Sequence, residues 1–366
     1  MFSLSNKCEI SIQLSEMIWN IGSSDISSIV KSTTEALNSK IFTFNNVFSL
    51  IDSVATYRPK HLKTIFMFCK QLIAANHISL NKGTFKNEQL CALLVKDQLL
   101  NCFIPIKYRK MTIEQLYRSY EEKTIEYALL WDDKDILEYV MEEQQLYPDS
   151  NLNNDFTVID LAAKFGAQDC FKYLYSISPC VTMNTLRKSF IGNNNKIIQI
   201  CLKHYKPDTL CIENAVMAHH NSTVAKLIKE YKLNFSWSSC LQYFNMQCFF
   251  MKVSVSNNVN LKDFEKNNAV IASSLYSNLV AAEYLIKLNV DVNETDSMEN
   301  SPLIISSINN SKEMVELLVR NHANIFQTDA YGRTASEYAE IKENKKISSY
   351  LNKIEQQIID NMVSSS

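Results

Sequence analysis

Residues 291–333 read DVNETDSMENSPLIISSINNSKEMVELLVRNHANIFQTDAYGR, and parts of this segment recur along the chain. Its first six residues match NVNLKD at 258–263 and NIFQTD at 324–329, each at a spacing of 33 residues. At the same spacing Ser301-Pro302 falls on Thr334-Ala335, and a leucine column is formed by Leu285, Leu318 and Leu351. A fixed period of this length predicts a repeat protein, whose units bury their apolar faces against their neighbours.

Each unit has the parts of a helix pair followed by a finger. Ser301 and Pro302 are typical of a helix start, because serine accepts a hydrogen bond from a free N–H and proline fits the first helical position. We expect a short helix over 303–308 and a turn at Asn309-Asn310, since asparagine tolerates the left-handed conformation that ends a helix. A second helix is expected over 312–320, and a polar finger over 321–333.

One segment carries a family resemblance. Residues 157–174 (TVIDLAAKFGAQDCFKYL) resemble the ankyrin repeat, with its pattern T-P-L-H-x-A-A, a glycine, and a second helix ending in leucine. The matching positions are Thr157, Leu161, Ala162, Ala163, Gly166 and Leu174. Val158 replaces the family's proline, and Asp160 replaces a histidine that links neighbouring repeats, so those links are not implied here. The resemblance implies an all-α fold, an ankyrin-repeat solenoid.

The same register predicts about eight degenerate units. They span residues 124–154, 155–181, 182–208, 209–233, 234–263, 264–296, 297–329 and 330–355. The unit at 234–263 fits worst, and its turn is not fixed by the pattern. Glycine is rare, with five in 366 residues, so other residues must form the turns between paired helices. The candidates are Asp132, His220, Asn278 and Asn310.

The two ends lie outside this pattern. Residues 1–123 read as a small helical domain, with amphipathic stretches at 44–55, from Pro59 onward, and at 84–100. Residues 347–362 place one apolar face, including Ile347 and Met362, on a capping helix, whose end and tail occupy 356–366. Tyr57-Arg58-Pro59 and Trp131-Asp132-Asp133 resemble segments of ankyrin proteins abundant in trichomonad parasites. Those carry a helical N-terminal domain of unknown function before degenerate repeats, which implies three parts here: 1–123, 124–355 and 356–366.

Composition limits the partners and the compartment. With 37 basic and 39 acidic residues the net charge is −2, which gives no electrostatic footprint for nucleic acid. The basic cluster Lys107-Tyr108-Arg109-Lys110 is short, and we interpret it as a solvated loop. No stretch is long and apolar enough to span a membrane, and Glu9 and Glu16 interrupt any secretory signal. Ten single cysteines favour a reducing compartment. We therefore expect a cytoplasmic monomer, with the nucleus as the alternative compartment.

Metal binding and nucleophilic catalysis are the alternative classes of function. Ligand-type residues gather at Cys201, His204, Cys211, His219 and His220. However, Cys201 falls at a position of the second helix of its repeat that faces the core. Zinc sites usually show two pairs of closely spaced ligands. A Cys–His nucleophile cannot be recognised from spacing, and the chain has no P-loop, GxGxxG, GxSxG or HExxH motif. We therefore expect no cofactor, no metal and no catalysis.

The function that the repeats favour is protein binding. A solenoid presents an extended concave surface built from its inner helices and finger tips. The candidate partner-binding residues lie in the last two fingers and are Asn293, Thr295, Asp296, Phe326, Gln327, Asp329, Tyr331 and Arg333. Phe326 has two interpretations, a partner contact or a side chain packed beneath its own finger. The alternative function is a two-part scaffold, in which residues 1–123 recruit a second partner.

Overall fold

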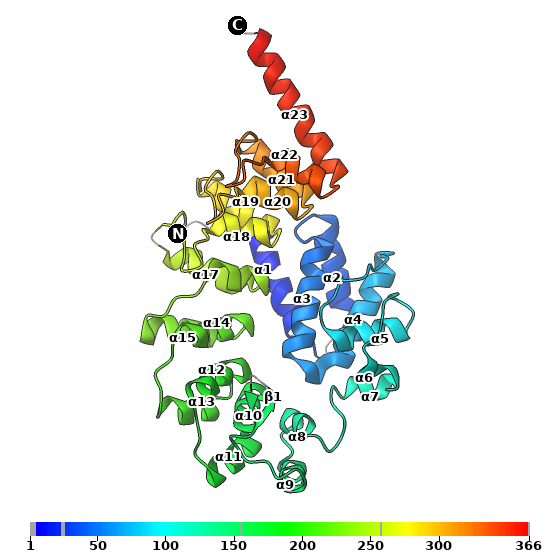
Figure 1. Cartoon of the computed structure of the whole chain (residues 1–366), viewed down its shortest axis with the longest axis vertical. Coiled ribbons are helices and arrows are strands. Elements are labelled where there is room, and N and C mark those ends of the chain that lie inside the picture. Colours follow the sequence, from blue (N-terminus) through cyan, green and yellow to red (C-terminus); the bar gives the residue numbers. More distant parts are fainter. Residues whose placement is uncertain (1–4, 23–25, 154–155, 257, 365–366) are drawn as a thin grey trace. The chain divides into compact units, whose positions relative to one another are not determined.

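The computed structural model describes residues 5–22, 26–153, 156–256 and 258–364. Over this part of the chain the fold is all-α, as predicted, apart from one antiparallel pair of short strands, β1 (Asn151–Asn153) and β2 (Phe156–Thr157). Helix pairs follow one another along the chain from the green segments to the red C-terminal helix (Figure 1).

Seven helices and one short 3₁₀ turn precede the pairs in the described residues. They are α1 (Asn6–Trp19), α2 (Ile26–Asn38), α3 (Phe44–Tyr57), η1 (Pro59–His61), α4 (Leu62–Ala75), α5 (Glu88–Lys96), α6 (Ile106–Arg109) and α7 (Ile113–Tyr117). The apolar stripe at 44–55 became α3. The stretch predicted at 84–100 forms a shorter helix, α5, because Asn87 caps its start and Gln98 leaves it with a φ of 61°.

Eight helix pairs follow in the described residues, which confirms the repeat architecture. They are α8 (Ile125–Trp131) with α9 (Lys134–Glu143), α10 (Val158–Phe165) with α11 (Gln168–Ile177), α12 (Met183–Gly192) with α13 (Asn195–Leu202), α14 (Thr209–Met217) with α15 (Asn221–Tyr231), α16 (Trp237–Gln242) with α17 (Met246–Val255), α18 (Ala269–Leu275) with α19 (Leu279–Lys287), α20 (Pro302–Ile308) with α21 (Lys312–Arg320), and α22 (Ala335–Ile341) with α23 (Lys345–Ser364).

The chain forms two compact units. Unit 1 contains the described parts of residues 1–13, 36–46 and 236–366, and unit 2 contains those of 14–35 and 47–235. Segments from 1–123 therefore belong to both units. In unit 1 the Phe42 ring meets the edge of Phe244, with centroids 4.8 Å apart. In unit 2 the Trp19 ring stacks on His219 at 4.0 Å.

The first helices of successive pairs pack against one another. In unit 2, α8 contacts α10, α10 contacts α12, and α12 contacts α14; in unit 1, α16, α18, α20 and α22 form the same kind of row. Ala162 and Ala163, on α10, are both fully buried. A Cβ on Gly192 would lie 2.3 Å from the carbonyl oxygen of Ala163, so only glycine allows α12 to approach α10 this closely.

Asp160 supplies a link between repeats that the family pattern did not imply. One carboxylate oxygen accepts a hydrogen bond from Thr185 Oγ1, and the other accepts one from Asn184 Nδ2, both at 2.7 Å. The same side chain also closes a capping box with Thr157. The aspartate therefore joins α10 to α12 by a different hydrogen-bond pattern from the histidine it replaces.

Two of the four predicted turn residues are correct. Asp132 and Asn310 adopt the left-handed conformation, with φ of 56° and 55°. At the other two turns the left-handed residue lies one position earlier, at His219 and Ser277. His220 and Asn278 instead stand directly before the next helix, where the Asn278 side chain accepts a hydrogen bond from the N–H of Ala281.

The repeat predicted at residues 234–263 is a regular helix pair. Its turn, which the sequence pattern does not fix, lies at Phe244, with a φ of 56°, and Asn245 caps α17. The capping helix predicted at 347–362 is α23, whose apolar face includes the buried Ile347 and Leu351. The Met362 side chain lies outside the described residues.

Candidate functional site: the C-terminal fingers

Each C-terminal finger is built around an aspartate that recurs every 33 residues. Asp263 Oδ1 accepts hydrogen bonds from the backbone N–H groups of Glu265 and Asn267, at 2.9 and 3.4 Å. Asp296 Oδ1 does the same with Met298 and Asn300, at 2.8 and 2.9 Å. Asp329 Oδ1 accepts from Tyr331 and Arg333, both at 2.9 Å. Aspartate is suited to this position because its short side chain can close a turn on its own backbone.

Asparagines join each finger to the next. Asn260 Oδ1 accepts from the N–H of Asp291 at 3.1 Å, and Asn293 Oδ1 accepts from the N–H of Asn324 at 2.7 Å. The last two fingers share a second link, in which Gln327 Nε2 donates to the carbonyl oxygen of Asn293 at 3.1 Å. The fingers are therefore a hydrogen-bonded series.

The Asp329 carboxylate has an additional partner and a shifted pKa. Its side chain is buried, with 4% of the residue exposed, and Oδ2 accepts from Tyr338 Oη at 2.6 Å. Burial alone would raise the pKa of Asp329, but the hydrogen bonds from Tyr338 and from the N–H groups of Arg333 and Tyr331 outweigh it and lower the pKa. The Tyr338 phenol correspondingly has a raised pKa, mainly because its hydrogen bond to Asp329 favours the protonated form.

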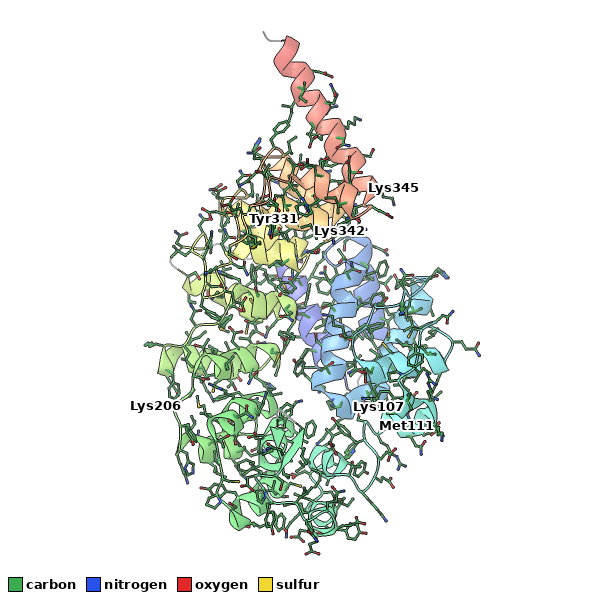
Figure 2. The ribbon with its side chains drawn as sticks, in the orientation of Figure 1. Lys107, Met111, Lys206, Tyr331, Lys342 and Lys345 are labelled. Atoms are coloured by element: carbon green, nitrogen blue, oxygen red, sulfur yellow. The ribbon has the colours of Figure 1, made fainter. Side chains whose placement is uncertain are left out.

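Three of the predicted residues present their side chains to solvent. Phe326 is 46% exposed and Tyr331 is 68% exposed, so Phe326 is not packed beneath its own finger. Arg333 is also exposed, and its guanidinium lies 5.7 Å from the centre of the Tyr338 ring. Tyr331 is labelled in Figure 2, apart from Lys342 and Lys345, which mark the connection between α22 and α23.

The structure thus divides the eight predicted residues into two kinds. Asn293, Asp296 and Asp329 use their side chains within and between fingers, together with the amide of Gln327. Phe326, Tyr331 and Arg333 remain accessible, and Thr295 is half-buried beside them. Tyr338 is a further residue of this site, and it lies in α22 rather than in a finger. The only signal for it in the sequence is its spacing of nine residues from Asp329.

The cysteines and histidines at 201–220, considered above as a possible metal site, are buried or have hydrogen-bond partners in the fold. Cys201 and Cys211 are buried, and burial raises the pKa of each thiol to about 12. His204 Nε2 lies 3.0 Å from Tyr175 Oη. Within the described residues, no three His, Cys, Asp or Glu side chains converge on a point where they could hold a metal ion.

The basic cluster at 107–110 is partly neutralised. Lys107, Tyr108 and Arg109 lie in the short helix α6, so the interpretation of this cluster as a loop was wrong. Lys107 Nζ forms an ion pair with Glu88 at 2.7 Å. The positive charge of Lys107 is therefore paired with an acidic neighbour rather than free to bind the phosphate backbone of a nucleic acid. Among the described helices, none is long and apolar enough to cross a membrane.

Comparison with known families agrees with this geometry. Stacked helix pairs with projecting fingers define a helical-repeat protein. The family of ankyrin repeats, as a model of three copies, matches residues 269–360, and a domain of unknown function (DUF3447) matches 177–252. A search of curated proteins finds no match. The chain therefore carries ankyrin repeats at residues 269–360, and the segment that matches DUF3447 is also made of helix pairs, from α12 into α17. Ankyrin repeats are in general protein-binding modules without catalytic activity.

Proposed function

We propose that this chain binds a protein partner, without catalysis, through its last two fingers and the inner helices beside them. The observation that supports this most directly is the contrast within residues 326–333. The backbone of the finger is fixed by the buried Asp329, while Phe326 and Tyr331 expose large aromatic surfaces. A rigid backbone that presents aromatic side chains needs little ordering on binding, which favours affinity.

In this proposal the eight candidate residues have different roles. Phe326, Tyr331 and Arg333 contact the partner, because aromatic residues and arginine are enriched among the residues that dominate binding energies. Asn293, Asp296 and Asp329 position the fingers, and Thr295 and Gln327 border the contact surface. We also propose that the protein acts as a cytoplasmic monomer, with the nucleus as the alternative location.

A triple variant tests the finger surface. Phe326→Ala, Tyr331→Ala and Arg333→Ala, combined in the full chain, should reduce partner capture from an extract of the source cell at least tenfold. Truncating one central contact residue often lowers affinity by about 1–2 kcal/mol or more, and about 1.4 kcal/mol corresponds to tenfold. Quantitative mass spectrometry of the captured proteins measures the change.

The matched control changes exposed residues of the same repeat that lie outside the finger. Lys342→Ala with Lys346→Ala should capture the same proteins as the unaltered chain. Circular dichroism should show an unchanged helix content for both variants. Equal capture by the triple variant and the control would contradict the finger surface.

A scaffold with a second binding surface is the alternative, and one observation favours it. Phe103 is 66% exposed and Ile106 is 78% exposed, so unit 2 carries an apolar surface that the fold does not use. If this surface recruits another protein, Phe103→Ala with Ile106→Ala should lose a different set of captured proteins from the finger variant. Loss of the same set, or of none, would leave a single binding surface.

A further inference from the structure

A cavity in unit 2 collects basic side chains. Its volume is about 280 Å³, at the small end of ligand pockets, which usually measure roughly 300–1,000 Å³. One wall is formed where α8, α10, α12 and α14 end, and the facing wall comes from the end of α1 and from residues 57–61. The helices concerned are labelled in Figure 1.

Six basic residues line this cavity, and no acidic residue does so among the described residues. They are Arg58, Lys60, His61, Lys164, His219 and His220. They come from separate repeats and from the segment before α4, so the fold rather than the local sequence brings them together. Arg58, Lys60 and Lys164 carry the positive charge of the cluster, since the pKa values of His61 and His220 are lowered. Like charges gathered in one partly buried place are unfavourable unless something compensates them.

Two acidic residues act on members of the cluster from outside the lining, Glu16 on His219 and Asp132 on Lys60. The Glu16 carboxylate lies 3.1 Å from His219 Nδ1 and accepts from Asn221 Nδ2 at 3.0 Å. Asp132 accepts hydrogen bonds from the backbone N–H groups of Asp169 and Cys170. In the described part of the chain, Arg58, Lys60 and Lys164 have no carboxylate within ion-pair distance.

Burial is the largest effect on the pKa of these groups, and for Lys60 the nearby Asp132 opposes it. Partial burial lowers the pKa of Arg58, Lys60 and Lys164, and the neighbouring Lys188 lowers that of Lys164 further. The pKa of His61 is lowered by burial first, then by Arg58 and Lys60. Arg58, Lys60 and Lys164 therefore keep their charges at a free-energy cost, which a bound anion would relieve.

A purely structural role explains only some of the cations. Helix C-terminal ends carry partial negative charge and attract basic groups. Arg58 donates to the carbonyl oxygen of Trp19, and His220 Nε2 lies 2.8 Å from that of Ile191. Lys60 and Lys164 instead lie over aromatic rings, those of Trp131 and Phe156, at 5.8 and 4.9 Å from the ring centres. Neither ammonium group caps a helix end.

We propose that this cavity binds a phosphate group, held by Arg58, Lys60 and Lys164. The Arg58 guanidinium supplies a fixed positive charge, because Nη1 donates to the carbonyl oxygen of Trp19 and Nη2 lies 3.1 Å from His61 Nε2. The two lysines supply compact charges from the opposite walls. A phosphate group carries more charge than a carboxylate and matches the excess of cations better. It can belong to a free small molecule or to a phosphorylated side chain of a partner protein, and the volume admits either.

The test uses the full chain and two probes at matched ionic strength. Pyrophosphate represents a free ligand, a phosphoserine peptide represents a modified partner, and sodium chloride with the unphosphorylated peptide are the references. We expect at least one probe to raise the thermal unfolding midpoint and to give a saturable binding isotherm by calorimetry. The probe that binds more tightly identifies the source. No stabilisation by either probe beyond its reference would overturn the proposal.

Charge-neutral variants locate the site. Lys60→Gln with Lys164→Gln should weaken binding of the effective probe at least tenfold. Lys203→Gln with Lys206→Gln removes the same charge from exposed positions of unit 2 and should leave binding unchanged. If the double variant fails to fold, Lys60→Gln alone, at an exposed side chain, should weaken binding several-fold. Unaltered affinity in the cavity variants would show that the lysines serve only the fold.

Discussion

At the scale of single residues, the polar finger positions hold the fingers rather than offer contacts. The sequence indicated Asn293, Asp296 and Asp329 as candidates because polar residues in a projecting loop are typical of binding surfaces. A short carboxylate or amide in a turn can also bind its own backbone, and sequence alone does not distinguish the two uses. The structure assigns all three to hydrogen bonds within and between fingers.

Asp329→Asn should lower the free energy of unfolding, and the loss should depend on pH. The folded protein lowers the pKa of Asp329 below its ordinary value of 3.8, so this carboxylate contributes stability above that value. The contribution is lost as the pH falls through the lower, folded-state pKa. Urea unfolding at pH 7 should therefore separate the variant from the unaltered chain, and the difference should shrink below about pH 4.

The exposed Glu340→Gln serves as the control for this measurement. It removes a carboxylate from the same repeat without touching the finger, so its effect should stay within about 0.5 kcal/mol. A pH-independent difference for Asp329→Asn would show that the carboxylate charge is not what stabilises the finger.

At the scale of elements, the periodic pattern predicted most helices correctly. The helix expected at 312–320 is α21, because its apolar residues and its flanking turns all agree. The turn residues were harder to predict. Asparagine fits both a left-handed turn and a helix cap, and Asn278, which the sequence places at the turn, caps α19. The cavity could not be predicted, since Arg58 and Lys164 are brought together only by packing of distant elements.

At the scale of the molecule, residues 1–123 contribute to the core of the repeats. Trp19, 3% exposed, stacks on His219 in unit 2, and Phe42, 2% exposed, packs on Phe244 in unit 1. Sequence analysis predicts a separate helical domain up to residue 123, because the 33-residue pattern is absent there. A period reveals which segments resemble one another, but not which unrelated segments they pack against. The boundary at residue 123 stays a prediction.

These contacts predict that residues 124–366 alone are much less stable than the full chain. Truncating one buried phenylalanine or tryptophan costs about 3–5 kcal/mol, and the deletion removes both Trp19 and Phe42 together with α1 to α7. Together these losses approach the roughly 5–15 kcal/mol that stabilises a typical domain. Urea titration followed by circular dichroism should therefore give a lower midpoint and a broader transition for the fragment. Phe103→Ala in the full chain, at an exposed position, should shift the midpoint little. If the fragment unfolds at the same midpoint as the full chain, the repeats are stable without the N-terminal helices, and the prediction is wrong.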